Sequence, residues 1–234
     1  MTDHQLNLTE SVGVVGSVTV AMRSYYSTKY LWSAEHHARL AGEIEDAHVG
    51  ESTFLLRHTA YVIDAITDAV AFAEAAVNEV AQDVADGHES YVAELDQSVR
   101  NHVAGYWVAG SEASALAKYS AILEFVTGNP LDFGQEPTQS MSALIKLRNH
   151  LVHYKPTDVS EAYDRPKLAH LLNDRFPDNA LMAGSGNAWF PDKALGAGCA
   201  RWAAVTAKTF VDAWSQTLGL TLNVHRVDWS EEPP

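Results

Sequence analysis

One uninterrupted run without proline or glycine, from Glu51 to Asp86, constrains the fold more than any other feature of the sequence. Apolar side chains recur within this run at intervals of three, four or seven residues: Leu56, Ile63, Ile66, Val70, Val77, Val80 and Val84. This periodicity predicts a long amphipathic helix. The Asp86-Gly87 pair then interrupts the pattern and marks the end of the helix.

Apolar periodicity predicts further helices on both sides of this run, weakest over 88–110 and strong again over about 191–218. They cover residues 31–47, part of 88–110, 111–126, a segment opened by Pro137, 167–173 and about 191–218. Strand-like alternation is confined to the short stretch VGSVTVAM near the N-terminus. The loops between the helices are short and no polar linker separates them, so we predict an all-α helical bundle of about five to six helices in one domain. The predicted boundaries are an N-terminal extension (1–30), the bundle (31–218) and a frayed C-terminal tail (219–234).

The composition limits the classes of partner. With 47% apolar residues the chain has enough material for a substantial core, and a net charge of −14 argues against general affinity for nucleic acid or anionic membranes. The single cysteine, Cys199, is interpreted as a small buried apolar residue in a reducing compartment. No stretch has the features of a signal peptide or a membrane-spanning helix, so we expect a cytoplasmic protein without membrane contact.

Several common sites are absent from the sequence or incomplete in it. The glycines around Gly13 and Gly184 are too sparse for a nucleotide-binding loop, and no serine lies in a nucleophile elbow. Glu45 and His48 have the Glu-x-x-His spacing of a helical di-metal site, but no second such pair follows. We therefore interpret this segment as a solvated acidic helix end and expect no metal and no cofactor.

The segment ALIKLRNHLVHYKP, residues 143–156, is unusual because a core helix becomes basic and histidine-rich just before a proline. Arg148 falls in the same helical stripe as Leu144 and Val152, so a cation is placed where burial is expected. Such burial is costly unless the cation meets a partner. Asn149 and His153 share a helix face, whereas Arg148 and His153 lie roughly 140° apart on an ideal helix.

The pattern Arg148-Asn149-x-x-x-His153 resembles the Arg-polar-x-x-x-His signature of HEPN domains. The resemblance covers residues 31–218 in general arrangement, and residue by residue only 148–153. It implies an all-α bundle that forms a homodimer with a shared cleft. It further implies a metal-independent endoribonuclease of the toxin–antitoxin or phage-defence type, restrained in some systems by an antitoxin protein. Other members of that family are non-catalytic modules that bind a nucleotide or a protein partner.

A second polar pair lies on the apolar side of the long predicted helix. Glu74 falls within about 40° of Val70 on the apolar stripe, and Asn78 lies one turn further along the same side. We expect Glu74 to contact Arg148 and thereby bridge two helices. The alternative is that Glu74 lies at the solvated edge of the stripe. Glu79 is predicted to face solvent.

The charge distribution indicates where an anionic ligand would bind. Residues 146–175 hold six basic and four acidic side chains, while residues 1–145 hold six basic and 20 acidic ones. The basic excess therefore coincides with the Arg148 segment, where Lys146 and Lys155 are candidate phosphate or RNA contacts and Tyr154 is a supporting residue. The acidic remainder would repel RNA elsewhere.

The residue types at this segment suit RNA cleavage without a metal ion. A histidine such as His153 can transfer protons at neutral pH, and Arg148 can stabilise charge on a phosphorane. Asn149 would position the phosphate or orient His153, and a dimer would supply a second His153. His150 is a less favoured candidate that we place at the surface or interface. In the non-catalytic interpretation, Arg148 pairs with Glu74 and His153 caps the carbonyls at the end of its helix.

Overall fold

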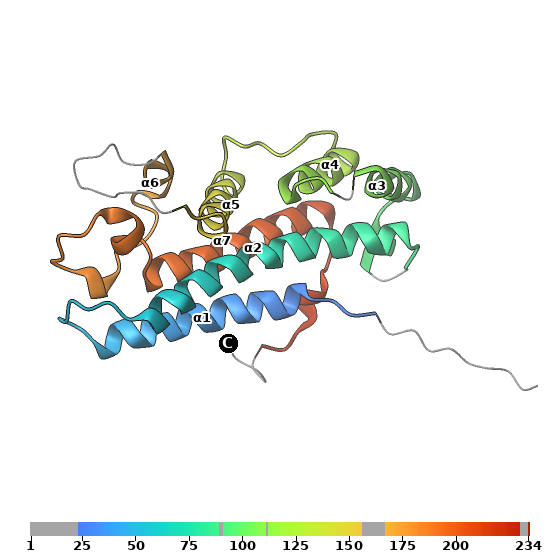
Figure 1. Ribbon diagram of the computed structural model, residues 1–234. Helices are drawn as coiled ribbons and strands as arrows, with labels where there is room; N and C mark the ends of the chain where they lie inside the picture. Colours follow the sequence, from blue (N-terminus) through green and yellow to red (C-terminus); the bar gives the residue numbers. More distant parts are fainter. Residues whose placement is uncertain (1–22, 89–90, 111, 156–166, 230–233) are drawn as a thin grey trace, which may run out of the picture.

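The protein forms a helical bundle. The computed structural model describes residues 23–88, 91–110, 112–155, 167–229 and 234, and within these ranges it contains helices and no β-strand (Figure 1). The α-helices are α1 (Ser27–Ala47), α2 (Leu56–Ala85), α3 (Gln97–Gly110), α4 (Ala115–Thr127), α5 (Thr138–Val152), α6 (Lys167–Leu172) and α7 (Ala197–Leu218). The all-α prediction is confirmed. The stretch VGSVTVAM and residues 1–22 of the expected N-terminal extension lie outside the described residues.

Three long helices, α1, α2 and α7, run side by side and form the base of the bundle (Figure 1). Their contact faces are rich in alanine, which lets the helix backbones approach closely. The fully buried alanines include Ala34 and Ala41 on α1, Ala65 and Ala69 on α2, and Ala200 and Ala203 on α7. Because α2 has 30 residues, it extends about 45 Å and contacts α1, α3, α4, α5 and α7.

The helices α3, α4 and α5 cross the other side of α2 (Figure 1). Tyr119 on α4 anchors this layer, because its ring is fully buried and packs edge-on against Phe210 and Trp214 of α7. The Tyr119 hydroxyl donates a hydrogen bond to the Ala73 carbonyl of α2 at 2.8 Å, and Trp214 donates its indole N–H to the Tyr119 carbonyl at 3.1 Å. These contacts hold α4, α2 and α7 in fixed register, so the side chains between them have defined partners.

The start of α1 is fixed by Glu79 of α2. Its Oε1 atom accepts hydrogen bonds from the backbone amides of Tyr26 at 2.7 Å and Ser27 at 2.8 Å, and its Oε2 atom accepts one from the Ser27 hydroxyl at 2.7 Å. A carboxylate satisfies the free amides at a helix N-terminus and also favours its dipole. The prediction that Glu79 faces solvent was therefore wrong, and α1 begins four residues before the expected position 31.

The C-terminal tail packs onto the bundle. A short 3-10 helix, η4 (Asn223–Arg226), contacts α1, and Leu220, Leu222 and Val224 are buried in the common core. His225 also contacts Asp212 of α7, with 2.9 Å between Nε2 and Oδ1. The expectation that residues 219–234 are frayed was thus wrong for the part of the tail that carries these apolar side chains.

The segment between α6 and α7 is turn-rich, as predicted, but it is also packed. It contains a 3-10 turn, η2 (Ala180–Met182), and a kinked turn, η3 (Trp189–Lys193), and it buries Leu181, Met182 and Phe190. Pro191 lies in η3, so α7 starts at Ala197 rather than at the predicted residue 191. In the described part of the chain, none of the helices is both long enough and apolar enough to span a bilayer.

Candidate functional site

Helix α5 carries the predicted motif and is held by its apolar face. Met141, Leu144 and Leu147 are fully buried against the bundle. Pro137 precedes the first turn, as predicted, and His153 is the C-cap residue, with its backbone N–H bonded to the Asn149 carbonyl at 3.0 Å. The helix thus ends at the motif histidine.

The contact predicted between α2 and α5 is confirmed. Arg148 donates an Nη2 hydrogen bond to Oε1 of Glu74, and the two side chains form an ion pair. The Arg148 side chain is 22% exposed and the Glu74 side chain 41% exposed. The Nε atom of Arg148 is buried and makes no hydrogen bond within the described part of the protein. Arg148 is therefore neutralised by a partly exposed carboxylate and keeps one unused buried donor.

Glu74 is the first of three polar residues spaced four apart on one face of α2. Glu74, Asn78 and Gln82, which we call the polar strip, each bind a different crossing helix. Asn78 accepts a hydrogen bond from Lys118 Nζ of α4 at 3.0 Å, and Gln82 accepts one from the Trp107 indole of α3 at 2.8 Å. The sequence indicated Glu74 and Asn78 but gave no partner for Asn78.

Lys118 is a site residue that sequence reasoning missed. It is only 7% exposed, and its ammonium lies 4.8 Å from the centre of the Trp107 ring. Burial lowers the pKa of Lys118, and the nearby Glu74 carboxylate acts in the opposite direction. The sequence did indicate that Lys118 is buried, because it is four residues before the buried Ile122 and so lies on the core face of α4.

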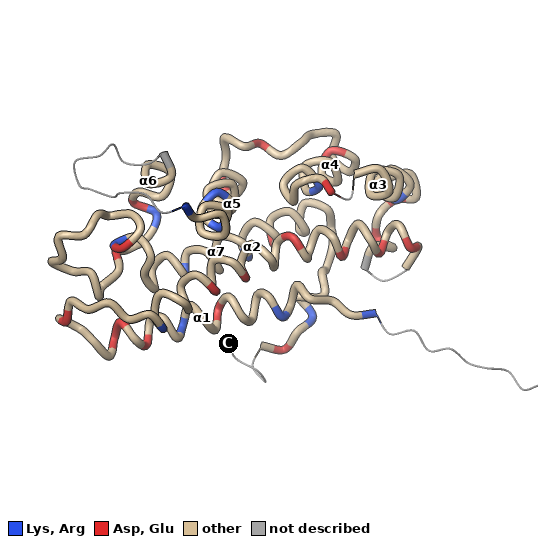
Figure 2. Tube along the Cα trace, viewed as in Figure 1, with Lys and Arg blue, Asp and Glu red and all other residues tan. Residues whose placement is uncertain are grey.

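The remaining predicted residues are presented at the surface around the end of α5. Lys146, Asn149, His153, Tyr154 and Lys155 are all exposed. Figure 2 shows Lys and Arg positions gathered at α5 and near α6, whereas acidic positions recur along α2. Arg165, which contributed to the basic excess, lies outside the described residues.

The two motif side chains do not meet in one chain. Within the described residues, no hydrogen bond or ion pair joins His153 or Asn149 to Arg148, because Arg148 points to α2 while His153 stands at the exposed helix end. His150 packs its ring against Phe190 of η3, with ring centres 5.3 Å apart. His150 thus has a structural contact that His153 lacks.

The Glu45 segment differs from the prediction of a solvated helix end. Glu45 is buried, and its Oε1 atom is 2.9 Å from His58 Nε2 and accepts a hydrogen bond from the Ala197 amide at 2.7 Å. His48 instead turns its Nδ1 towards the Ile44 carbonyl. No group of three or more potential metal ligands is found among the residues that the structure describes.

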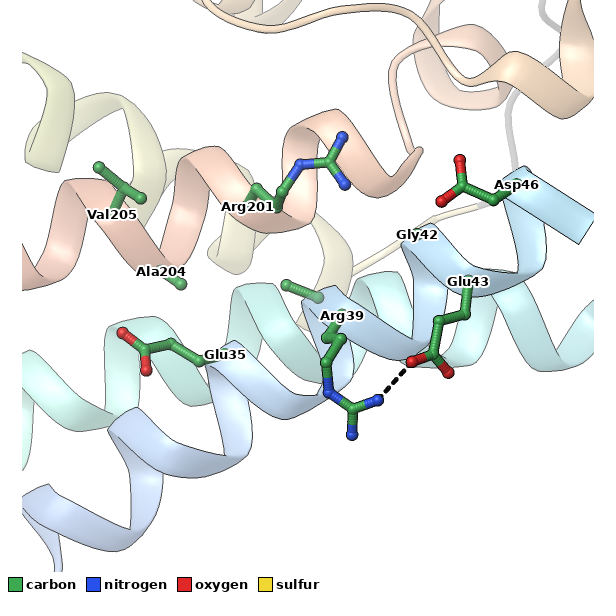
Figure 3. Close-up of a pocket in the computed structure, with 9 residues that line it drawn as sticks. Glu35, Arg39, Gly42, Glu43, Asp46, Arg201, Ala204 and Val205 are labelled. Atoms are coloured by element: carbon green, nitrogen blue, oxygen red, sulfur yellow. Dashed lines mark hydrogen bonds and ion pairs between the residues drawn. The ribbon is translucent and has the colours of Figure 1, made fainter. Parts of the chain in front are cut away.

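Two further features lie away from the polar strip. Cys199 is fully buried, as predicted, and burial raises the pKa of its thiol. A groove of about 390 Å³ runs between α1 and α7 (Figure 3), where the Arg201 side chain lies over Gly42 and the Arg39 side chain turns away to pair with Glu43. Glu35 lines the same groove, and partial burial raises the pKa of its carboxyl group.

The chain was compared with known proteins at three levels. No protein-family model matches it, and neither the curated proteins nor the solved structures include a significant match.

Proposed function

We propose that the protein is a HEPN-like, metal-independent endoribonuclease whose site is built around Arg148 and His153. The observation that carries the proposal is the end of α5. There an exposed histidine, His153, makes no side-chain hydrogen bond within the described residues, and Arg148 lies one to two turns earlier on the same helix. An imidazole that is free of internal partners is available for proton transfer to a substrate.

In the proposed reaction, one imidazole removes the proton from the 2′-hydroxyl of RNA, and that oxygen attacks the adjacent phosphorus. A second imidazole donates a proton to the departing 5′-oxygen, which leaves a 2′,3′-cyclic phosphate and a 5′-hydroxyl. Arg148 stabilises the negative charge that develops on the phosphorane. Asn149 and Lys155, both exposed near His153, would hold the neighbouring phosphate.

The reaction needs a base and an acid, and His153 supplies one imidazole per chain. We therefore propose a homodimer in which two α5 ends face one shared cleft. Val152 and Tyr154 support this arrangement, because they flank His153 and are 55% and 50% exposed, which leaves apolar surface for a second copy to cover. In the proposed system, an antitoxin protein would restrain the enzyme by covering the same surface.

The ion pair between Arg148 and Glu74 favours a second candidate function. A guanidinium that is already neutralised can serve to join α5 to α2, with no reaction at all. The protein would then be a non-catalytic module that binds a nucleotide or a protein partner.

An RNA-cleavage assay with purified protein in the presence of a chelator separates the two functions. We expect wild-type protein to cleave RNA and His153→Ala to lose at least a hundredfold in rate, since general acid–base catalysis contributes about 10²–10⁴-fold. The matched control is His150→Ala, which changes a histidine three residues away. His153 is exposed, so circular dichroism should show an unchanged fold for this variant.

Cleavage by His153→Ala at the wild-type rate would contradict the assigned role. Failure of the wild-type protein to cleave any RNA would favour the non-catalytic function.

A further inference from the structure

Lys118 is a buried residue whose ammonium group has fewer partners than donors. The ammonium group carries three N–H donors, and within the described residues it forms one hydrogen bond, to Oδ1 of Asn78 at 3.0 Å. The Trp107 ring offers a weak electrostatic partner on another side. Burying a cation is unfavourable unless an anion compensates it, yet no carboxylate within the described residues forms an ion pair with Lys118.

Arg148 approaches the same part of α2 from the neighbouring helix. It binds Glu74, one helical turn before Asn78, which corresponds to about 6 Å along the axis of α2. Its Nε donor is also buried without a partner in the part of the chain that the structure describes. Two cations from α4 and α5 therefore contact the turn of α2 from Glu74 to Asn78, and Glu74 is the one carboxylate within that turn.

We propose that Lys118 and Arg148 together bind one phosphate group, and that Glu74 holds the place of this phosphate in the ligand-free protein. The ligand class is single-stranded RNA, so this inference rests on the proposed function and extends it by a second cation and a competing carboxylate. The Glu74 carboxylate leaves donors of Lys118 and Arg148 without a partner. The oxygens of a phosphate group would accept hydrogen bonds from these donors.

The exposure of the three side chains gives the direction of entry. Glu74 is the most exposed at 41%, Arg148 is intermediate, and Lys118 lies deepest. A phosphate therefore enters at Glu74, displaces its carboxylate from Arg148 and reaches Lys118 last. A recessed cation of this kind favours an unpaired strand, whose backbone can be pushed into the site, over a regular duplex.

The proposal predicts opposite effects for two charge removals. Lys118→Gln keeps a donor for Asn78 but removes the positive charge, so RNA should bind about tenfold more weakly. Glu74→Gln keeps an acceptor for Arg148 but removes the competing negative charge, so RNA should bind severalfold more tightly. Lys29→Gln is the matched control, because Lys29 also lies over an aromatic ring, that of Tyr26 on the exposed start of α1.

The probe is a fluorescein-labelled single strand of 2′-O-methyl RNA, which has no free 2′-hydroxyl and cannot be cleaved by the proposed reaction. Its dissociation constant is measured by fluorescence anisotropy over a series of salt concentrations. Loss of one phosphate contact should make the slope of log affinity against log salt less steep by about 0.7 in Lys118→Gln. A purely structural lysine would leave this slope unchanged.

Two results would overturn the inference: absence of binding by the wild-type protein, or wild-type affinity and salt slope in Lys118→Gln. If Lys118→Gln does not fold, Glu74→Gln decides alone, and unchanged or weaker binding by that variant contradicts the assigned competition.

The nuclease proposal fails separately. If Lys118 is needed for binding but natural RNA is never cleaved, the phosphate site stands without the catalytic function. If His153→Ala abolishes cleavage while Lys118→Gln binds normally, the nuclease stands without this site.

Discussion

At the scale of single residues, Glu45 brings a carboxylate into the core and links three segments of the chain. Its Oε1 atom is within hydrogen-bonding distance of His58 at the start of α2 and of the Ala197 amide at the start of α7. Burial is the largest influence on its pKa and raises it, but the hydrogen bonds from His58 and Ala197 outweigh burial, so the pKa of Glu45 is lower than usual.

This lowered pKa predicts a dependence of stability on pH. A carboxyl group with a depressed pKa in the folded state stabilises the fold above its unfolded pKa of about 4.3, and this contribution disappears as the pH falls through the folded value. Glu45→Gln should therefore be less stable than wild type at pH 7, and the difference should shrink below about pH 4. Urea unfolding of both proteins from pH 7 to pH 3 measures it.

Glu43→Gln serves as the control for Glu45→Gln. Glu43 pairs with Arg39 on the exposed side of the same helix, and we expect a change within about 0.5 kcal/mol. A stability difference for Glu45→Gln that is equal at pH 3 and pH 7 would refute the assignment.

A buried polar contact could be predicted from the sequence where both of its residues interrupt an apolar helical pattern. Glu74 and Arg148 both stand on apolar stripes, so each indicated the other. Glu45 offered no such indication, because one of its donors is a backbone amide 152 residues away, which leaves no mark in the side-chain pattern. Lys118 was missed because the pattern of α4 was interpreted by its apolar members alone.

At the scale of elements, the junction between the segment before α7 and α7 itself depends on close backbone contact. A Cβ atom at Gly198 would lie 2.6 Å from the Pro177 carbonyl oxygen, and one at Gly196 would lie 2.6 Å from the Asn179 Cα atom. These glycines let residues 177–196 fold back over the start of α7, where Asn179 bonds the Asp192 and Leu195 carbonyls at 3.1 Å each. Helix periodicity does not report such close backbone contacts, so the start of α7 was predicted too early in the chain.

Two alanine substitutions within helices should have opposite effects. Gly198→Ala forces the Pro177 backbone to move and should lower the free energy of unfolding by about 1–3 kcal/mol. A Cβ atom at Gly105 on α3 would have no neighbour within 4 Å. Gly105→Ala should therefore raise the free energy of unfolding by about 0.5–1 kcal/mol, because alanine favours the helix. Urea denaturation of both variants tests the pair, and stabilisation by Gly198→Ala would contradict the close packing.

At the scale of the whole molecule, the core includes residues from Leu31 to Val224, which extends past the boundary expected at 218. The periodicity of the long helices was enough to predict an all-α bundle. It was not enough to predict the tail, because Leu220, Leu222 and Val224 lie beyond the last α-helix, and the tail is buried by packing on α1.

Truncation of a tail side chain tests how far the tail stabilises the bundle. Leu222 is 4% exposed, so Leu222→Ala should lower the free energy of unfolding by about 2–4 kcal/mol. Val227 is 39% exposed, and Val227→Ala should change it by less than about 0.5–1 kcal/mol. Thermal unfolding measures both, and equal effects of the two substitutions would mean that the tail does not belong to the core.

The hydrogen bond from the Ala197 amide to Glu45 has a consequence for biosynthesis. A ribosome that adds about 5–20 residues per second needs roughly 8–30 seconds to make the 152 residues that separate the two partners. Helices α1 and α2 are both synthesised before that interval ends, while the Glu45 carboxylate still lacks the donor that α7 supplies. The nascent chain therefore completes this part of the core only after the start of α7 has been synthesised.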